Sequence, residues 1–227
     1  MDSVFDQAIS DYFAGKQQGP LLIHNQYGPP DEMDLAAYFR QREDFNAAEI
    51  YAISLCRGRI LDIGAAAGAM SLALQAAGHD VVALDNSPAC CQIMEKQGLL
   101  QIRQADFFEW EGEQFNTLLL MMNGLGICGT LARLPLLLAR LKKLLAPGGH
   151  VLFDSSDVSY LYDKPPSGPY YGEMTYRYEY NGRQGPWFNW LYLASHTLRE
   201  QLAGSEWQMQ ILYEDDLGHY LGRLTLQ

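Results

Sequence analysis

Three aspartates that follow or end short apolar runs are the residues whose type and spacing indicate chemistry. Asp62, Asp85 and Asp106 occur in three successive runs of this kind, each separated from the next by a helix-like or polar segment. Because the carboxyl ends of parallel strands meet at one edge of a sheet, we expect the three carboxylates to lie together. Such a group accepts hydrogen bonds from hydroxyls and attracts a cationic group.

A loop of small residues adjoins the first of these acids. The segment Gly64-Ala65-Ala66-Ala67-Gly68 follows an apolar run, and its small side chains allow a ligand to approach the backbone closely. Asp85 lies seventeen residues beyond Gly68, where a carboxylate can accept both hydroxyls of a ribose. An adenosine-containing cofactor is therefore expected.

The position of Asp62 indicates which adenosine cofactor fits. It lies two residues before Gly64, where its charge would oppose a pyrophosphate and favour an ammonium or sulfonium group. The loop also lacks the spacing G-x-G-x-x-G that is typical of dinucleotide sites. A cationic cofactor is favoured over a dinucleotide.

The elements that must position these residues alternate between strands and helices. Ser87 followed by Pro88 predicts a helix start, and Pro135 predicts another. This alternation is typical of a doubly wound α/β fold with a mostly parallel, Rossmann-like sheet. The predicted parallel strands are the apolar runs 60–63, 81–84, 100–102, 117–122 and 151–153.

The pattern changes outside this region. Residues 207–213 and 219–226 alternate in polarity and predict a terminal antiparallel hairpin, which completes a seven-stranded sheet. A second hairpin, turning at Asn181-Gly182, is predicted within an insertion at about 158–193. Residues 1–56 are expected to form an N-terminal helical cap, followed by the cofactor-binding domain at 57–227.

In this order and spacing the sequence resembles the class I S-adenosylmethionine-dependent methyltransferase family. The resemblance extends over roughly residues 57–227, and its closing hairpin stands where that family places its reversed last strand. The matching segments are Leu61–Gly68, Val82–Pro88, Gln104–Phe107 and Leu144–Asp154.

The resemblance implies S-adenosylmethionine as cofactor and assigns residues to its parts. Asp62, Gly64 and Gly68, with Ala65 and Ala66 between them, would surround the methionine part. Asp85 and Asn86 would hold the ribose and adenine, and Asp106 with Phe107 would recognise the adenine. Ala66 occupies the place of the family's usual third glycine, and we expect it to reduce cofactor affinity; Asn116 stands where many members carry an acid.

The segment after the fourth parallel strand should border the transferred methyl group. Met122 and Asn123 open this segment, and Asn123 is equally suited to contact the acceptor or to hydrogen-bond its own turn. Asp157 and His219 are further candidate proton acceptors, with turn and surface roles as the alternative. A base is dispensable when alignment supplies most of the acceleration.

Aromatic residues are concentrated in the insertion, since residues 160–192 hold 11 of the 27 aromatic side chains. Tyr176, Tyr178, Trp187 and Trp190 are candidates to bind a flat or cationic acceptor. Alternatively, these rings serve only as cross-strand pairs that hold the hairpin to the sheet.

The charge and composition exclude several classes of partner. A net charge of −11 disfavours binding to nucleic acid, and the apolar runs are too short to span a membrane. The histidines show no metal-ligand spacing, and the opening residues show no signal peptide, so we expect a cytoplasmic protein without a metal.

The function predicted from the sequence is in-line methyl transfer from S-adenosylmethionine to a small-molecule acceptor. One alternative is a partner subunit that binds S-adenosylmethionine without catalysis. A third is a nicotinamide-dependent reductase, which the loop spacing disfavours.

Overall fold

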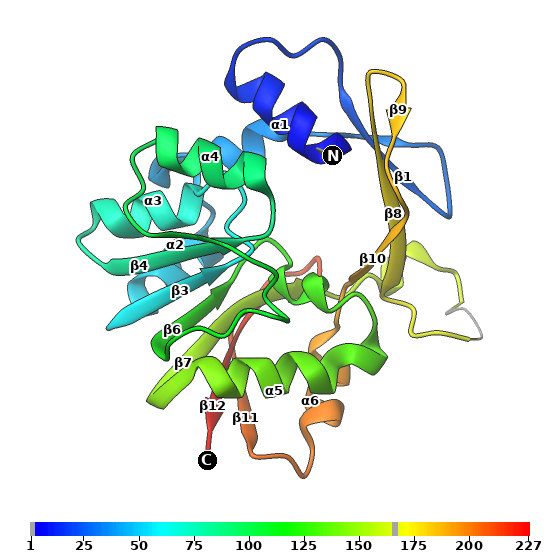
Figure 1. Ribbon diagram of the computed structural model, residues 1–227. Helices are drawn as coiled ribbons and strands as arrows, with labels where there is room; N and C mark the ends of the chain where they lie inside the picture. Colours follow the sequence, from blue (N-terminus) through cyan, green and yellow to red (C-terminus); the bar gives the residue numbers. More distant parts are fainter. Residues whose placement is uncertain (1–2, 165–167) are drawn as a thin grey trace.

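The computed structural model describes residues 3–164 and 168–227 and forms two β-sheets with helices around them (Figure 1). Residues 1–2 of the expected N-terminal cap and 165–167 of the expected insertion lie outside the described residues. No described helix is long and apolar enough to cross a bilayer.

The larger sheet has seven strands in the order β11-β12-β7-β6-β3-β4-β5. Five strands are parallel, and β12 runs antiparallel to both β7 and β11, which confirms the predicted fold class. The third parallel strand begins at Ile102 rather than at the exposed Leu100. The bounds are β3 Arg59–Ile63, β4 Asp80–Asp85, β5 Ile102–Gln104, β6 Phe115–Leu120, β7 Leu145–Ser156, β11 Trp207–Glu214 and β12 His219–Leu226.

Helices cover both faces of this sheet because its central strands are apolar on both sides. Leu61 of β3 belongs to the core formed with α5 and α6, whereas its neighbour Ile60 belongs to the core formed with α2, α3 and α4. As predicted, Ser87 caps α4, since its hydroxyl oxygen accepts from the amide of Cys90 at 3.0 Å. The helices are α2 Ala47–Leu55, α3 Ala69–Ala76, α4 Pro88–Lys96, α5 Leu134–Leu144 and α6 Ser195–Leu202.

The smaller sheet joins the inserted hairpin to the N-terminal segment. Its order is β10-β8-β1-β2, with β9 paired to β8. The predicted hairpin is present, and Asn181 and Gly182 turn it with φ of 49° and 73°. The strands are β1 Leu21–Asn25, β2 Asp31–Met33, β8 Glu173–Tyr180, β9 Arg183–Gln184 and β10 Phe188–Leu191.

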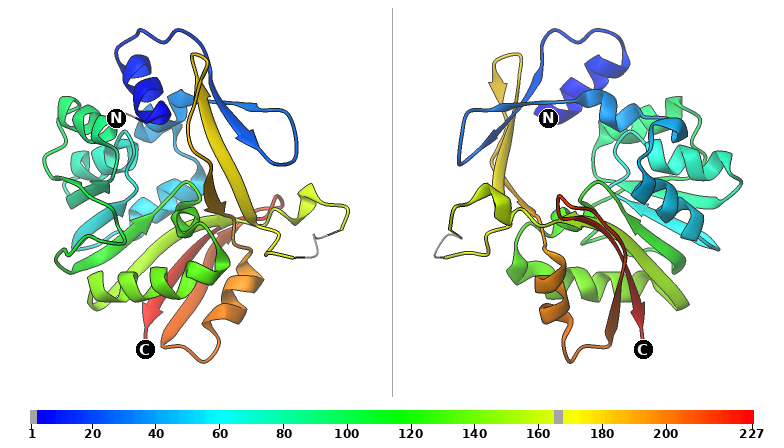
Figure 2. Two further views of the ribbon diagram at one scale, coloured as in Figure 1. Left: turned by 45° about the vertical axis from the view of Figure 1, so that its right-hand side comes forward. Right: turned by 180° about the vertical axis from the view of Figure 1, so that it is seen from behind.

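The N-terminal segment contains helices, as expected, and also the strands β1 and β2, which the sequence analysis did not predict. These strands are short, and β1 pairs with β2 on one side and with β8, far along the chain, on the other, so no local pattern indicates the second pairing. The helical parts before α2 are α1 Val4–Phe13 and the 3-10 helices η1 Leu35–Phe39 and η2 Arg42–Asp44. Figure 2 shows the smaller sheet as a separate layer with α1 beside it.

Candidate functional site

A cavity of about 920 Å³ lies between the carboxyl ends of the parallel strands and the smaller sheet. Residues from β3, β4 and the segment after β6 line one side, and residues from α1, η1, β8 and β10 line the other. Most of the residues predicted from the sequence line it, namely Asp62, Gly64, Ala65, Ala66, Asp85, Asn86, Asp106, Phe107, Met122, Asn123, Tyr176, Tyr178 and Trp190.

Asp62 is a buried acid at the end of β3, with only 3% of its surface exposed. Its Oδ2 accepts a hydrogen bond of 2.6 Å from the hydroxyl of Ser71 in α3. Burial raises the pKa of Asp62 to about 6, although the Ser71 hydrogen bond opposes this shift. The carboxyl group is thus mostly ionised at neutral pH and can attract a cation.

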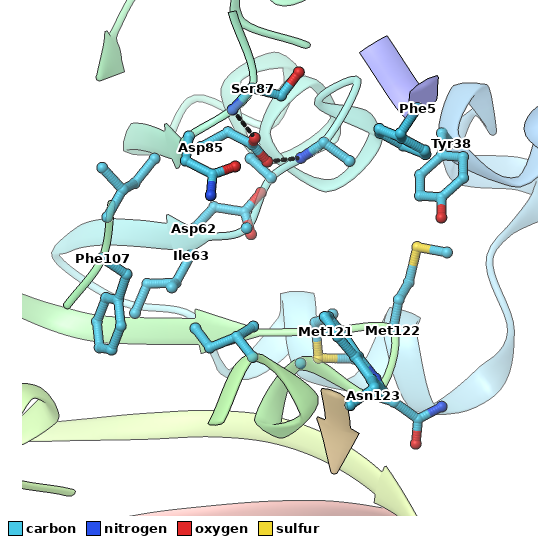
Figure 3. Close-up of a pocket in the computed structure, with 18 of the residues that line it drawn as sticks. Phe5, Tyr38, Asp62, Ile63, Asp85, Ser87, Phe107, Met121, Met122 and Asn123 are labelled. Atoms are coloured by element: carbon cyan, nitrogen blue, oxygen red, sulfur yellow. Dashed lines mark hydrogen bonds between the residues drawn. The ribbon is translucent and has the colours of Figure 1, made fainter. Parts of the chain in front are cut away.

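Asp85 ends β4 and is held by two backbone amides (Figure 3). Its Oδ2 accepts from Ala66 and its Oδ1 from Ser87, both at 2.8 Å. Burial raises the pKa of Asp85, and these two amide hydrogen bonds counteract the rise. The carboxylate therefore fixes the loop after β3 relative to the start of α4.

The loop after β3 carries three residues in the left-handed backbone region. Gly64 has φ of 74°, Ala66 has 50° and Gly68 has 89°. The amide of Gly64 donates to the carbonyl of Leu84 in β4 at 2.8 Å, and no atom lies within 4 Å of the position of a Cβ at Gly64, so this point of the loop is open. Gly68 is the one predicted loop residue outside the cavity lining; a Cβ there would lie 2.7 Å from Cγ of Met94.

The residues predicted to contact the adenine follow β4 and β5, the second and third parallel strands along the chain. Asn86 is exposed directly after Asp85. Asp106 follows β5 and accepts from the amide of Phe108 at 2.7 Å through Oδ1, which leaves Oδ2 available. Phe107 is largely buried beside it and faces the cavity from the side opposite Tyr38 (Figure 3).

Met122 and Asn123 follow β6 in a strained conformation. Both are left-handed, with φ of 62° and 55°, so the strand ends at Leu120 rather than at Met122 as expected. Met122 is 41% exposed and reaches into the cavity. The Asn123 side chain turns downward instead, and its Oδ1 accepts from the hydroxyl of Ser156 at 2.8 Å. This hydrogen bond occupies the Asn123 oxygen within the protein.

The insertion places three of its four predicted aromatic residues at the cavity. Tyr176 and Tyr178 of β8 and Trp190 of β10 line it. Trp187 does not belong to the lining; it is 49% exposed, and the guanidinium of Arg177 lies 4.7 Å from its ring centre. Trp187 precedes β10, which begins at Phe188.

The two remaining base candidates also lie outside the cavity lining. Asp157 accepts from the hydroxyl of Tyr171 and the amide of Ser159, and these hydrogen bonds hold its pKa below the usual range. His219 is largely exposed and pairs with Asp215 at 3.2 Å in the terminal hairpin. Asp157 and His219 thus have the turn and surface roles that were expected as the alternative to a proton acceptor.

The N-terminal segment supplies cavity residues that the sequence analysis missed. Phe5 and Asp6 come from α1, Tyr38 from η1, and an ion pair forms from Arg40 and Glu49 with Nη2 to Oε1 at 2.6 Å. Asp6 also accepts a hydrogen bond from the hydroxyl of Ser87. The capping boxes of α1 and α2 are local signals for helix starts, and they do not show where the helices pack.

The chemistry of this donor set fits an adenosine ligand with a cationic arm. Asp85 and Asp106 offer acceptor oxygens to hydroxyl and amino groups, and the open point at Gly64 leaves room beside the Asp62 carboxylate. Negative charge at this loop is suited to an ammonium or sulfonium group.

Comparison with known proteins identifies close similarity. A family model described as a methyltransferase domain matches residues 37–213. The crystal structure of a SAM-dependent methyltransferase from Bacteroides fragilis, in complex with S-adenosylhomocysteine, is 35% identical and has a TM-score of 0.91, covering 99% of this chain and 95% of the other. No curated protein matches the chain.

More distant structures share the fold. The DhpI-SAM-HEP complex is 21% identical with a TM-score of 0.62, covering 78% of this chain and 84% of the other. The glycopeptide N-methyltransferase MtfA is 14% identical with a TM-score of 0.59, covering 88% of this chain and all of the other. At these identities the likeness concerns the architecture alone.

Proposed function

The chain belongs to the class I S-adenosylmethionine-dependent methyltransferase family, and from this premise we propose that it methylates a small molecule bound beneath the smaller sheet. Its cofactor is S-adenosylmethionine. The observation that carries the proposal is that one continuous cavity reaches from the cofactor loop to the aromatic residues of β8 and β10. Its volume of about 920 Å³ lies near the top of the range of roughly 300–1,000 Å³ for small-molecule sites, in keeping with a cofactor and an acceptor together.

In this proposal, residues at the ends of different strands bind different parts of the cofactor. Asp62 and the loop from Gly64 bind the methionine part, Asp85 and Asn86 hold the ribose and adenine, and Asp106 with Phe107 recognises the adenine. The burial of Asp62 and the fixed geometry of Asp85 support this division, because preorganised carboxylates bind without further ordering.

When bound, S-adenosylmethionine would supply a methyl group on a positively charged sulfur: the acceptor atom would bond to the methyl carbon as the carbon–sulfur bond breaks, the sulfur would leave as a neutral thioether, and the acceptor's proton would pass to bulk solvent outside the site. The chain's own residues then act by holding the acceptor in line and excluding water. Alignment of this kind lowers barriers by roughly 7–11 kcal/mol in favourable cases. Asn123 takes no proton in this scheme, because its side chain is a neutral carboxamide and not a base; its oxygen accepts a hydrogen bond from Ser156.

Calorimetry with S-adenosylhomocysteine tests the cofactor site. We expect the Asp85→Ala variant to bind this ligand about 10- to 100-fold more weakly, because hydrogen bonds to a charged group are lost. Asp80→Ala is the matched control, since Asp80 is an exposed acid at the opposite end of the same strand. Equal affinity of the Asp85→Ala variant and the wild type would refute the assignment.

Turnover distinguishes an enzyme from a binding subunit. The protein alone, incubated with S-adenosylmethionine and a panel of small alcohols, phenols and amines, is expected to release S-adenosylhomocysteine with at least one of them. Release only when a copurifying protein is added would instead support the non-catalytic subunit.

A further inference from the structure

Five aromatic rings form a continuous surface over the acceptor side of the cavity, which we call the aromatic roof: Phe5, Tyr38, Tyr176, Tyr178 and Phe188. The ring of Phe5 lies 5.5 Å from that of Tyr38 and 5.3 Å from that of Tyr178. Phe188 continues the surface, 5.0 Å from Tyr178 and 6.2 Å from Tyr176. The roof thus combines rings of the N-terminal segment with rings of the insertion. Phe5 and Tyr38 meet edge to face at 76° and the other pairs are tilted by 32–45°, so the roof offers both ring faces and ring edges to an aromatic ligand.

The hydroxyl of Tyr38 is a polar group in the roof that makes only a weak hydrogen bond within the described residues. Among the described residues, the hydrogen-bond partner of its hydroxyl is the thioether of Met33 at 3.8 Å, a weak acceptor. Burial raises the pKa of Tyr38 far above its usual range, so the phenol stays protonated and neutral. In Figure 3 its hydroxyl points toward the side chain of Met122, which follows β6 at the end where the methyl group is expected.

The charges around the cavity disfavour an anionic acceptor. Among the described lining residues, five carboxylates stand against two guanidinium groups, and one of these, Arg40, is held by Glu49 in a two-pronged ion pair. The other, Arg133, is exposed, and its guanidinium lies 4.5 Å from the centre of the Phe108 ring. The net negative charge repels a carboxylate or phosphate under the roof.

We propose that the methyl acceptor is a planar aromatic molecule without negative charge, which lies against the aromatic roof and hydrogen-bonds to the hydroxyl of Tyr38. The proposal rests on the proposed function and adds the class of acceptor to it. Phe5 and Tyr38 become acceptor-binding residues, although they precede the parallel sheet in the sequence.

Three phenols of nearly equal shape test the charge requirement: tyramine is cationic, 4-hydroxyphenylacetamide is neutral and 4-hydroxyphenylacetate is anionic. Each is titrated into protein saturated with S-adenosylhomocysteine. We expect the cationic and neutral probes to bind at least tenfold more tightly than the anionic probe. Equal or tighter binding of the anionic probe overturns the proposal, and so does the absence of binding by all three.

Tyr38→Phe tests the hydroxyl, with Tyr160→Phe as control because Tyr160 is a largely exposed tyrosine outside the cavity lining. We expect Tyr38→Phe to weaken the cationic and neutral probes about three- to tenfold, as the loss of one hydrogen bond predicts, and the control to bind as the wild type does. Unchanged probe affinity in Tyr38→Phe overturns the inference.

Prior titration of S-adenosylhomocysteine separates this inference from the function on which it rests. Failure of the wild type to bind that ligand counts against the proposed function. Normal binding of that ligand to wild type and Tyr38→Phe shows that both are folded, so a failure of the phenol series then counts against the acceptor class alone.

Discussion

Ala66 has a backbone conformation that suits glycine better than alanine. Its φ of 50° lies in the left-handed region, which disfavours a side chain with a Cβ atom. The amide of Ala66 still donates to Asp85, so the conformation serves the hydrogen bond to the acid. The strain is thus localised at the cofactor loop.

Ala66→Gly is expected to stabilise the protein. Relief of the left-handed strain outweighs the added flexibility of the unfolded chain, so the free energy of unfolding should rise by roughly 0.5–1 kcal/mol. Denaturant unfolding measures this change. Ala65→Gly is the control, because Ala65 is not among the residues with positive φ and its replacement should destabilise the fold. Equal effects of the two substitutions would contradict the argument.

Asp62 predicts a pH dependence of cofactor binding. Its pKa is raised to about 6, and ligand binding favours the ionised form, so affinity is full above that pH and falls as the carboxyl is protonated. Between pH 7.5 and pH 5 the dissociation constant for S-adenosylhomocysteine should rise roughly tenfold. Calorimetry across this range measures the change.

Two variants identify Asp62 as the titrating group. Ser71→Ala removes a hydrogen bond that favours the ionised carboxylate, so the midpoint should move to higher pH. Asp62→Asn should bind weakly and nearly independently of pH. If the affinity of Asp62→Asn for S-adenosylhomocysteine changes with pH as much as that of the wild type, a group other than Asp62 causes the pH dependence.

The placement of Asp62 and Asp85 could be predicted from sequence because each is covalently next to a strand whose apolar run is readable. The contribution of Tyr38 could not, since its position depends on how η1 packs against a helix and a sheet elsewhere. Asn123 shows a further limit: its position after β6 was predicted, whereas its orientation follows from Ser156, which lies in another strand.

At the scale of elements, the inserted hairpin and the N-terminal strands depend on each other. The turn at Asn181-Gly182 predicted the hairpin that contains β8, but β1 is five residues long and carries no alternation of its own that identifies a partner. His24 of β1 and Glu179 of β8 interact across the junction, with Nε2 and Oε2 at 2.9 Å. The complete five-stranded sheet therefore needs both segments.

Gly182→Ala tests how much the turn at Asn181-Gly182 contributes to the stability of the hairpin that carries the aromatic roof. Gly182 has φ of 73° and open space around it, so the substitution strains only the backbone and should lower the free energy of unfolding by about 1 kcal/mol. Hydrogen exchange in β8 should become faster. Gly185→Ala is the control, because Gly185 has no positive φ and a Cβ there makes ordinary contacts. If both variants lower the free energy of unfolding equally, the positive φ of Gly182 is not the cause of the loss.

At the scale of the whole molecule, the cofactor site and the N-terminal helix are connected. The backbone amide of Ser87 donates a hydrogen bond to Asp85, and its hydroxyl donates one to Asp6 of α1. A ligand that fixes Asp85 should therefore also reduce the opening of α1.

Hydrogen exchange with and without S-adenosylhomocysteine measures this coupling. We expect slower exchange in Val4–Phe13 as well as in the loop after β3. In Ser87→Gly, which keeps the amide and a tolerable helix cap, protection should persist in the loop and disappear from α1. Protection confined to residues 60–110 in the wild type would show that the helix is independent.

The pairing of β1 with β8 also has a consequence for how the chain is made. His24 and Glu179 are separated by 155 positions, so during translation the first strand leaves the ribosome about 8–30 s before its partner does. For that interval the nascent chain presents an unpaired strand edge to its surroundings. Synthesis in the cell, rather than the stability of the finished enzyme, is then the stage at which a chaperone that shields β1 would matter most.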